Sequence, residues 1–279
     1  MISWSRLSAA AKGRPRRVLL PVLSCVVLVI IHLLNAVLGL NGTSAYPEWT
    51  NGFASRSVTW SGVQTSKGGS IELVDQGGAG IFRVDNPGAA WSGLTTQRAE
   101  RVAASSEMRV RTGSVRTFNF EVSVPLHLDD SPNSWLIFAQ IHQSLSKCPP
   151  NVDLRLTSSP FEALPVVDLT IRGGRLSSDV CAPQYERVFR VGNVIKGSRI
   201  SVSLSAAFSA ERGRAHTSVC LNDTMLVVAE NVPNLYTGMD AYLKQGIYRP
   251  RSRVRSVLTS ADVKFTKSVR CKCGGMRSC

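Results

Sequence analysis

Two side chains suited to acid–base chemistry lie two residues apart at the end of an apolar run. They close the segment Trp135-Leu136-Ile137-Phe138-Ala139-Gln140-Ile141-His142. This short run, rich in aromatic and branched residues and preceded by turn-forming residues, is typical of a β-strand. Because side chains alternate along a strand, Ile137, Ala139 and Ile141 are expected to share one face. Gln140 and His142 then project together from the other face, either into a site or as satisfied polar groups lining an inert cleft.

A second stretch of interest reads Tyr242-Leu243-Lys244-Gln245-Gly246-Ile247-Tyr248. If it is a strand, two phenols and an ammonium group share one face with Gly246. Glycine in a strand often marks the close approach of a ligand or of another backbone. A solvated strand face that happens to carry Lys and Tyr is the alternative reading.

Two short segments pair an acid with an arginine. They are Arg98-Ala99-Glu100 and Glu107-Met108-Arg109. In an extended chain the acid and base of each segment fall on the same face. Such a pair is commonly a structural ion pair, but an arginine can also grip a substrate carboxylate with two parallel hydrogen bonds.

The N-terminal part of the 279-residue chain predicts export. Residues 1–17 carry five Lys or Arg and no acid, and residues 18–40 form a 23-residue run without a charge. A run of this length predicts a signal anchor, with a cleaved signal peptide as the alternative, since small residues follow at 43–45. The basic segment should stay in the cytosol, which places residues 46–279 on the other side of the membrane, in the secretory pathway. The protein is then either extracellular or a single-pass membrane protein with its C-terminal domain outside the cytosol.

Cysteine usage agrees with export. Six cysteines follow the apolar run: Cys148, Cys181, Cys220, Cys271, Cys273 and Cys279. They allow up to three disulfides in 15 possible pairings. A zinc site at the C-terminal cysteines lacks the usual paired spacing and a nearby His, so we expect no metal. Asn41 and Asn222 head sequons that are candidates for glycosylation.

The chain after residue 46 alternates short strand-like segments with turns and shows almost no helical period. This pattern predicts an all-β sandwich or jelly roll. Besides the segments above, the candidate strands are 117–124, 152–156, 166–171, 187–191, 199–204, 217–221, 225–229 and 261–269.

The Gln-Ile-His segment, followed by Tyr-x-Lys-x-Gly-x-Tyr, resembles the polysaccharide lyases of the alginate lyase type (family seven), and the related glucuronan lyase type. The resemblance covers about residues 98–269. It implies a β-jelly roll (a concanavalin-like sandwich) and an Arg-x-Glu strand on the same sheet. It also implies β-elimination on a uronic acid polymer such as alginate or glucuronan, which leaves an unsaturated sugar end.

The carbon next to an ionised carboxylate is very weakly acidic, so a site for this reaction must neutralise that carboxylate. Gln140 and an arginine suit this task. The resemblance implies His142 as the base and Tyr248 as the proton donor to the leaving oxygen. Neither segment matches the group's full Arg-Ser/Thr-Glu-Leu-Arg motif, so the choice between Arg98 and Arg109 stays open. Arg98 is favoured, in a segment that keeps the leading arginine and the acid of the motif. The expected substrate-binding residues are Arg109, Lys244, Tyr242 and Arg249.

Two other functions compete with the lyase. The same jelly roll serves lectins, which hold glycans without cleaving them. An adhesion protein could instead use a basic run, which if extended lines one face with Arg249, Arg251, Arg253 and Arg255. The expected partner of that run is an acidic polysaccharide rather than nucleic acid, with a solvated loop as the plain alternative. We expect a monomer without a cofactor.

Overall fold

The computed structural model describes residues 56–66, 68–74, 79–85, 96–103, 109–131, 133–143, 148–158, 162–177 and 182–267, without the side chains of 225 and 226. The chain divides into two compact units, Met1–Gly52 and Phe53–Cys279, and every described residue belongs to the second. The basic segment 1–17 and the apolar run 18–40 lie outside the described residues, so export and anchoring stay predictions. Within the described ranges, no helix is long and apolar enough to cross a membrane.

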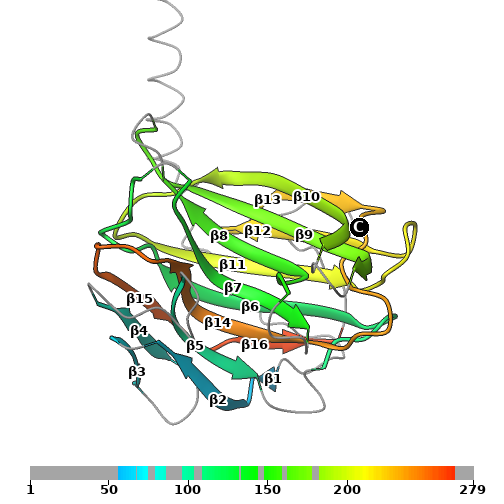
Figure 1. Cartoon of the computed structure of the whole chain (residues 1–279), viewed down its shortest axis with the longest axis horizontal. Coiled ribbons are helices and arrows are strands. Elements are labelled where there is room, and N and C mark those ends of the chain that lie inside the picture. Colours follow the sequence, from blue (N-terminus) through cyan, green and yellow to red (C-terminus); the bar gives the residue numbers. More distant parts are fainter. Residues whose placement is uncertain are drawn as a thin grey trace, which may run out of the picture. The chain divides into compact units, whose positions relative to one another are not determined.

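The described strands form two antiparallel sheets that stack as a β-jelly roll, as predicted (Figure 1). The seven-stranded sheet has the order β10 (Ala182–Asn193), β9 (Val166–Ser177), β8 (Val152–Thr157), β7 (Trp135–Gln143), β14 (Ala241–Pro250), β5 (Thr96–Ala103) and β2 (Trp60–Thr65). The nine-stranded sheet runs β13 (Thr224–Glu230), β12 (His216–Leu221), β11 (Arg199–Ala207), β6 (Val115–Ser123), β15 (Ser256–Ser260), β4 (Gly80–Val84) and β3 (Gly69–Leu73). Its remaining two strands are β16 (Lys264–Thr266), which pairs with β6, and β1 (Arg56–Ser57), which pairs with β16.

The hydrophobic core lies between the two sheets because both sheets present every second residue to it. From β6 it takes Phe118, Phe120 and Val122, and from β8 it takes Val152, Leu154 and Leu156. The residues between them point away from the core. We call the side of the seven-stranded sheet that faces away from the core the polar face.

The register of β7 contains a bulge that the sequence did not reveal. Ile137 pairs with Arg155 of β8 and Tyr248 of β14, whereas Ala139 pairs with Leu154 and Gln245. Phe138 is thus an extra residue relative to β8, and both it and Ala139 belong to the core. Directly opposed residues share a face, so Ile137 lies on the polar face. The expectation that Ile137 shares a face with Ala139 and Ile141 is wrong for this reason.

Gly246 marks the close approach of another backbone and not of a ligand. It sits within the matching irregularity of β14 with φ = 141°, and a Cβ added here would meet the carbonyl oxygen of Ala99 in β5. The residue therefore allows β5 and β14 to approach, rather than leaving room for a ligand.

The structure describes two of the six cysteines that follow the apolar run and one of the two sequons. Cys148 and Cys220 are both buried and disulfide-bonded. The other four cysteines that follow the apolar run lie outside the described residues, so the pairing stays a prediction. Asn222 is exposed in the turn between β12 and β13, where it and Asp223 both have positive φ. The other sequon, at Asn41, lies outside the described residues.

We expect Gly246→Ala to lower the free energy of unfolding by about 2–4 kcal/mol, because the added methyl group meets backbone atoms and the φ angle is unfavourable for alanine. Chemical denaturation followed by circular dichroism measures this change. Gly62→Ala is the matched control, since a Cβ at Gly62 of β2 meets nothing within 4 Å. Equal stability of the two variants would contradict the role assigned to Gly246.

Candidate functional site

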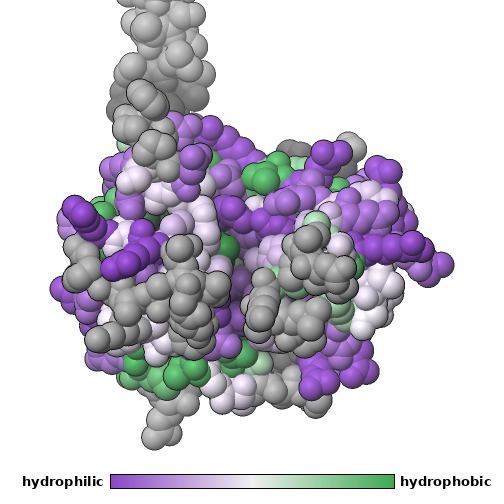
Figure 2. Space-filling model, in the orientation of Figure 1, coloured by the Kyte–Doolittle hydropathy of each residue, from purple (hydrophilic) through white to green (hydrophobic). Residues whose placement is uncertain are grey.

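The polar face gathers residues from three neighbouring strands that are far apart in sequence. Tyr242 and Lys244 of β14 lie opposite His142 and Gln140 of β7. On the other side of β14, Tyr248 lies opposite Arg98 of β5. Residues directly opposite each other share a face, so the two motifs and the Arg98 strand meet on one surface. Over the middle of the seven-stranded sheet the molecular surface is hollowed and largely hydrophilic (Figure 2).

Glu100 is a buried carboxylate at the centre of this surface. It accepts a hydrogen bond from Nε2 of Gln140, and its Oε2 lies 3.2 Å from Nε of Arg98. Burial raises the pKa of Glu100, against the charges of Arg98 and Lys244, which act to lower it. The sequence placed Glu100 beside Arg98 on a strand, but it did not identify this carboxylate as part of the site.

Two cations converge on the side chain of Gln64, in β2. Its Oε1 accepts hydrogen bonds from Nη1 of Arg98 at 2.6 Å and from Nζ of Lys244 at 3.1 Å. Burial lowers the pKa of Lys244 to about 8, although Glu100 acts to raise it. Sequence reasoning missed Gln64, because a single glutamine in a strand carries no functional signal.

Aromatic rings form the less buried part of the site. Tyr248, Trp135 and Tyr242 are half-buried, whereas the charged groups between them are almost completely buried. The guanidinium carbon of Arg98 lies 4.4 Å from the centre of the Tyr248 ring, and the Trp135 ring meets that ring edge-on at 5.3 Å between centroids. A sugar ring can pack on such aromatic surfaces while its polar groups reach the charges below.

His142 is held as a neutral imidazole on the polar face. Its Nδ1 lies 2.6 Å from the carbonyl oxygen of Gln143, which can only accept, so Nδ1 carries the proton. Nε2 is then the free acceptor of the ring. Burial, with a smaller effect from Lys244, lowers the pKa of His142 to about 3. The ring of Tyr242 lies 6.1 Å from that of His142 between centroids.

The structure does not place His142 opposite Tyr248. Tyr248 pairs with Ile137, five residues before His142 in β7, which is about 16 Å along the strand at 3.3 Å per residue. Arg98, Glu100 and Gln140 occupy the interval between the two residues. Arg98 and Tyr248 lie at one end of this surface and His142 and Tyr242 at the other. Lys244 links them, since its Nζ lies 5.5 Å from the centre of the Tyr242 ring and shares the Gln64 acceptor with Arg98.

The two remaining arginines that the sequence assigned to substrate binding lie elsewhere. Arg109 has a side chain that is 60% exposed and lies 3.7 Å from Asp240, outside the Glu100 cluster. Arg249 is buried on the opposite side of β14 from Tyr248, where protein groups accept its hydrogen bonds: Gln97 Oε1, Ser256 Oγ and the carbonyl oxygens of Val84 and Val254. Arg249 is therefore a structural residue, and its assignment to substrate binding is wrong.

The expected strip of four guanidinium groups does not form. The strand β14 ends at Pro250, and β15 begins only at Ser256. Arg251 and Arg253 are exposed in the connection, while Arg255 pairs with Asp85 at 2.8 Å. A chain that turns in this way does not hold the four side chains in one row.

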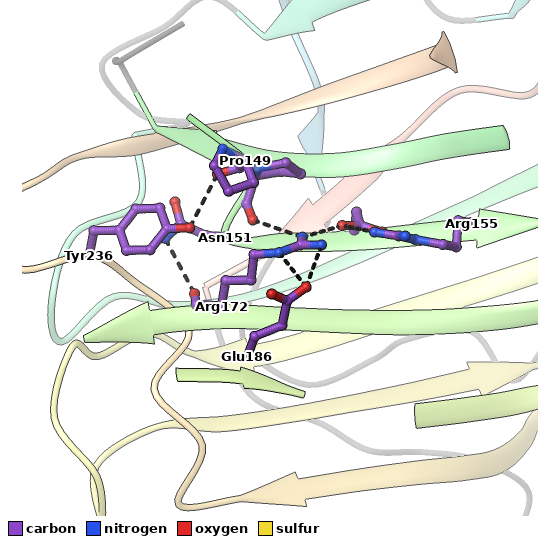
Figure 3. Close-up of polar contacts among 8 residues, drawn as sticks. Pro149, Asn151, Arg155, Arg172, Glu186 and Tyr236 are labelled. Carbon is purple, nitrogen blue, oxygen red and sulfur yellow. Dashed lines mark hydrogen bonds and ion pairs between the residues drawn. The ribbon is translucent and has the colours of Figure 1, made fainter. Parts of the chain in front are cut away.

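The other half of the polar face carries a compact network of compensated charges (Figure 3). The fully buried carboxylate of Asp153 accepts from Nε and Nη2 of Arg155 and from Nη1 of Arg172. Arg172 also contacts Glu186 and the carbonyl oxygen of Pro150. This network ties β8, β9 and β10 together. In the part of the chain that the structure describes, no group of three or more His, Cys, Asp or Glu side chains could hold a metal ion.

We expect the free energy of unfolding to fall as the pH drops from about 6.5 towards 3. The pKa of His142 is lowered from 6.5 to about 3 in the folded protein, so the unfolded chain binds one more proton in this window. The contribution of this residue between pH 6.5 and 5 is about 2 kcal/mol.

Denaturation of wild type and His142→Gln at pH 6.5 and at pH 5 measures this contribution of His142. The variant should lose less stability than the wild type on acidification. His127→Gln, which changes an exposed histidine, should keep the wild-type dependence. Identical pH dependence in wild type and His142→Gln would contradict the burial argument.

Comparison with known proteins shows the family and the fold of the chain. The model of a family described as polysaccharide lyase matches residues 58–266. No curated protein matches the chain. Three solved structures share the fold at low sequence identity. The endo-β-1,4-glucuronan lyase from the fungus Trichoderma reesei has a TM-score of 0.58 and 10% identity, over 78% of this chain and 95% of that one.

The exolytic alginate lyase from Zobellia galactanivorans has a TM-score of 0.51 and 8% identity, over 72% and 88% of the two chains. The alginate lyase from Klebsiella pneumoniae has a TM-score of 0.50 and 12% identity, over 71% and 84%. At these sequence identities the comparison shows a likeness of fold alone. The family match, in contrast, spans most of the chain, and the protein therefore belongs to the polysaccharide lyase family.

Proposed function

We propose that this polysaccharide lyase cleaves a uronic acid polymer, of the alginate or glucuronan kind, by β-elimination. The observation that carries the proposal is the meeting of Arg98, Lys244 and Gln140 around one buried acid, Glu100, beside Tyr248. Two cations face a single carboxylate whose pKa is raised, so the site has excess positive charge to offer an anionic sugar. Similar proteins of the same fold are glucuronan and alginate lyases.

The first requirement of the reaction is neutralisation of the uronate carboxylate. Removing the proton on the adjacent carbon delocalises a second negative charge onto that group. Arg98 and Lys244 are almost completely buried, so their charges are weakly screened and act strongly on this developing charge. Gln140 can add an amide donor, since its bond to Glu100 uses only one of its two N–H groups.

The second requirement is a path for the proton and the leaving oxygen. In the proposed reaction the proton next to the carboxylate passes to Tyr248 in its deprotonated form, and the electron pair of the broken C–H bond forms the carbon–carbon double bond as the bond from C4 to oxygen breaks. That oxygen takes the phenol proton of Tyr248. Tyr248 takes the role of base at the sugar that it contacts, because His142 lies five residues further along β7 than the partner of Tyr248. The guanidinium of Arg98 lies against the Tyr248 ring, so a positive charge is next to the group that transfers the proton.

A pKa of about 3 makes His142 a weak base in the free protein. The positive charges of Lys244 and Arg98 contribute to that low pKa, and a bound uronate carboxylate offsets both. Substrate binding should therefore raise the basicity of His142. Where the proton and the leaving oxygen lie on the same side of the sugar, Tyr248 alone can serve both, so the stereochemistry of the polymer decides the importance of His142.

The direct test is release of unsaturated sugar ends from mannuronate, guluronate and glucuronate polymers, followed by their ultraviolet absorbance. We expect at least one polymer to yield absorbing products and neutral glucans to yield none. Absence of product from every uronate polymer would refute the lyase. Together with measurable glycan binding it would support the lectin alternative, which the separation of His142 from Tyr248 favours.

We expect Tyr248→Phe to lower kcat by about a thousandfold or more, because proton transfer to the leaving oxygen is lost. The fold should persist, since the ring and its contacts with Arg98 and Trp135 are kept. Steady-state kinetics measures the effect. Tyr185→Phe on β10 is the matched control and should retain wild-type rates, whereas a fully active Tyr248→Phe would remove that residue from the mechanism.

A further inference from the structure

Gln64 occupies a position where the protein places a neutral amide between two cations. The two nitrogens that donate to its Oε1, from Arg98 and Lys244, are less than about 6 Å apart. Like charges at this distance repel each other, and here little water screens them because Arg98 is 7% exposed and Lys244 1%. A single amide oxygen carries only a partial charge, so it satisfies their hydrogen bonds without neutralising them.

A carboxylate would fit this position better than the amide does. It can accept one hydrogen bond from each cation on its two oxygens, and hydrogen bonds between ionised partners are about twice as strong as neutral ones. Burial, with the nearby Arg98, lowers the pKa of Lys244, and an anion beside the ammonium group would act to raise it. At the position of Gln64 Oε1 the two donors thus share a neutral acceptor where a carboxylate could accept from both.

The identity of residue 64 matters because of its neighbours in the sheet. Gln64 lies directly opposite Glu100 in the pairing of β2 with β5. A glutamate here would add a second acid to the cluster and cancel its excess positive charge. Gln64 is also half-buried on β2, which ends its sheet among the described strands, whereas Glu100 is fully enclosed. The glutamine side chain can therefore move aside, while Glu100 is held by Arg98 and Gln140.

We propose that Gln64 is a positioning residue that holds Arg98 and Lys244 ready for the uronate carboxylate and yields its place to that carboxylate on binding. The inference rests on the proposed function for the identity of the ligand. It adds a residue from outside both sequence motifs and assigns the carboxylate of the sugar undergoing cleavage to the gap between the two cations. Gln64 thereby favours charged over neutral sugars at this position.

Gln64→Glu tests the inference by supplying a competing carboxylate within the protein. The ligand is a saturated glucuronate or mannuronate trisaccharide, and its binding is measured by calorimetry on the Tyr248→Phe background, which prevents turnover. We expect Gln64→Glu to bind this trisaccharide at least a hundredfold more weakly. Gln64→Ala removes the amide without adding charge, and its binding should weaken by no more than about tenfold. Gln184→Glu, an equal change of charge on exposed β10, is the control and should bind like its parent.

Kinetics provides a readout that a purely structural role would not move. Lys244 must keep its charge to bind the carboxylate, so we expect its deprotonation to contribute to the alkaline limb of the pH–rate profile. In Gln64→Glu the added carboxylate should shift this limb to higher pH, while Gln64→Ala should not raise it. Equal losses in the two variants, or tight binding by Gln64→Glu, would overturn the inference. If the wild type binds the trisaccharide but releases no product, the proposed lyase fails while the carboxylate position is still tested by binding.

Discussion

The arrangement of the site depends on one buried carboxylate. Removing charges from water is costly unless each finds partners, and Glu100 is the acid that the cations on this part of the polar face share. Through it Gln140 of β7 and Arg98 of β5 are held across β14, which lies between their strands. Without Glu100, Arg98 and Lys244 would repel each other with only an amide between them. The geometry offered to a substrate is therefore a consequence of satisfying buried charge.

Strand register determines which side chains join this arrangement. Shifting a strand by one residue turns its side chains to the other face, and the irregularity around Phe138 does this within β7. It brings Ile137 to the polar face while keeping Gln140 and His142 there. Gly246 lies within the irregularity of β14 relative to β7, and its lack of a side chain lets β14 approach β5 in unbroken register, so that Tyr248 lies opposite Arg98. Backbone adjustments of a single residue thus decide the membership of the site.

The two halves of the polar face differ in charge balance. Around β5 and β14, two cations face one acid, whereas across β8 to β10 the shared carboxylate of Asp153 and the nearby Glu186 compensate Arg155 and Arg172 (Figure 3). An anionic group is attracted to the first half more strongly than to the second. The compensated half provides a fixed platform, because buried bidentate pairs tolerate little movement.

The sequence by itself determined the all-β class, the strands that carry the two motifs, and the residue types on which the proposed chemistry rests. Alternation of apolar and polar residues is a local property. Gln140 and His142 could therefore be assigned to one face of their strand, and Lys244 with Tyr248 to one face of theirs, before any strand was placed. Only the tertiary structure decided that Gln64 and Glu100 join the site, that Arg249 turns inward, and that Tyr248 lies opposite Ile137 rather than near His142. Those outcomes depend on pairing between distant strands and on where a bulge falls, and neither is encoded in the periodicity of any single segment.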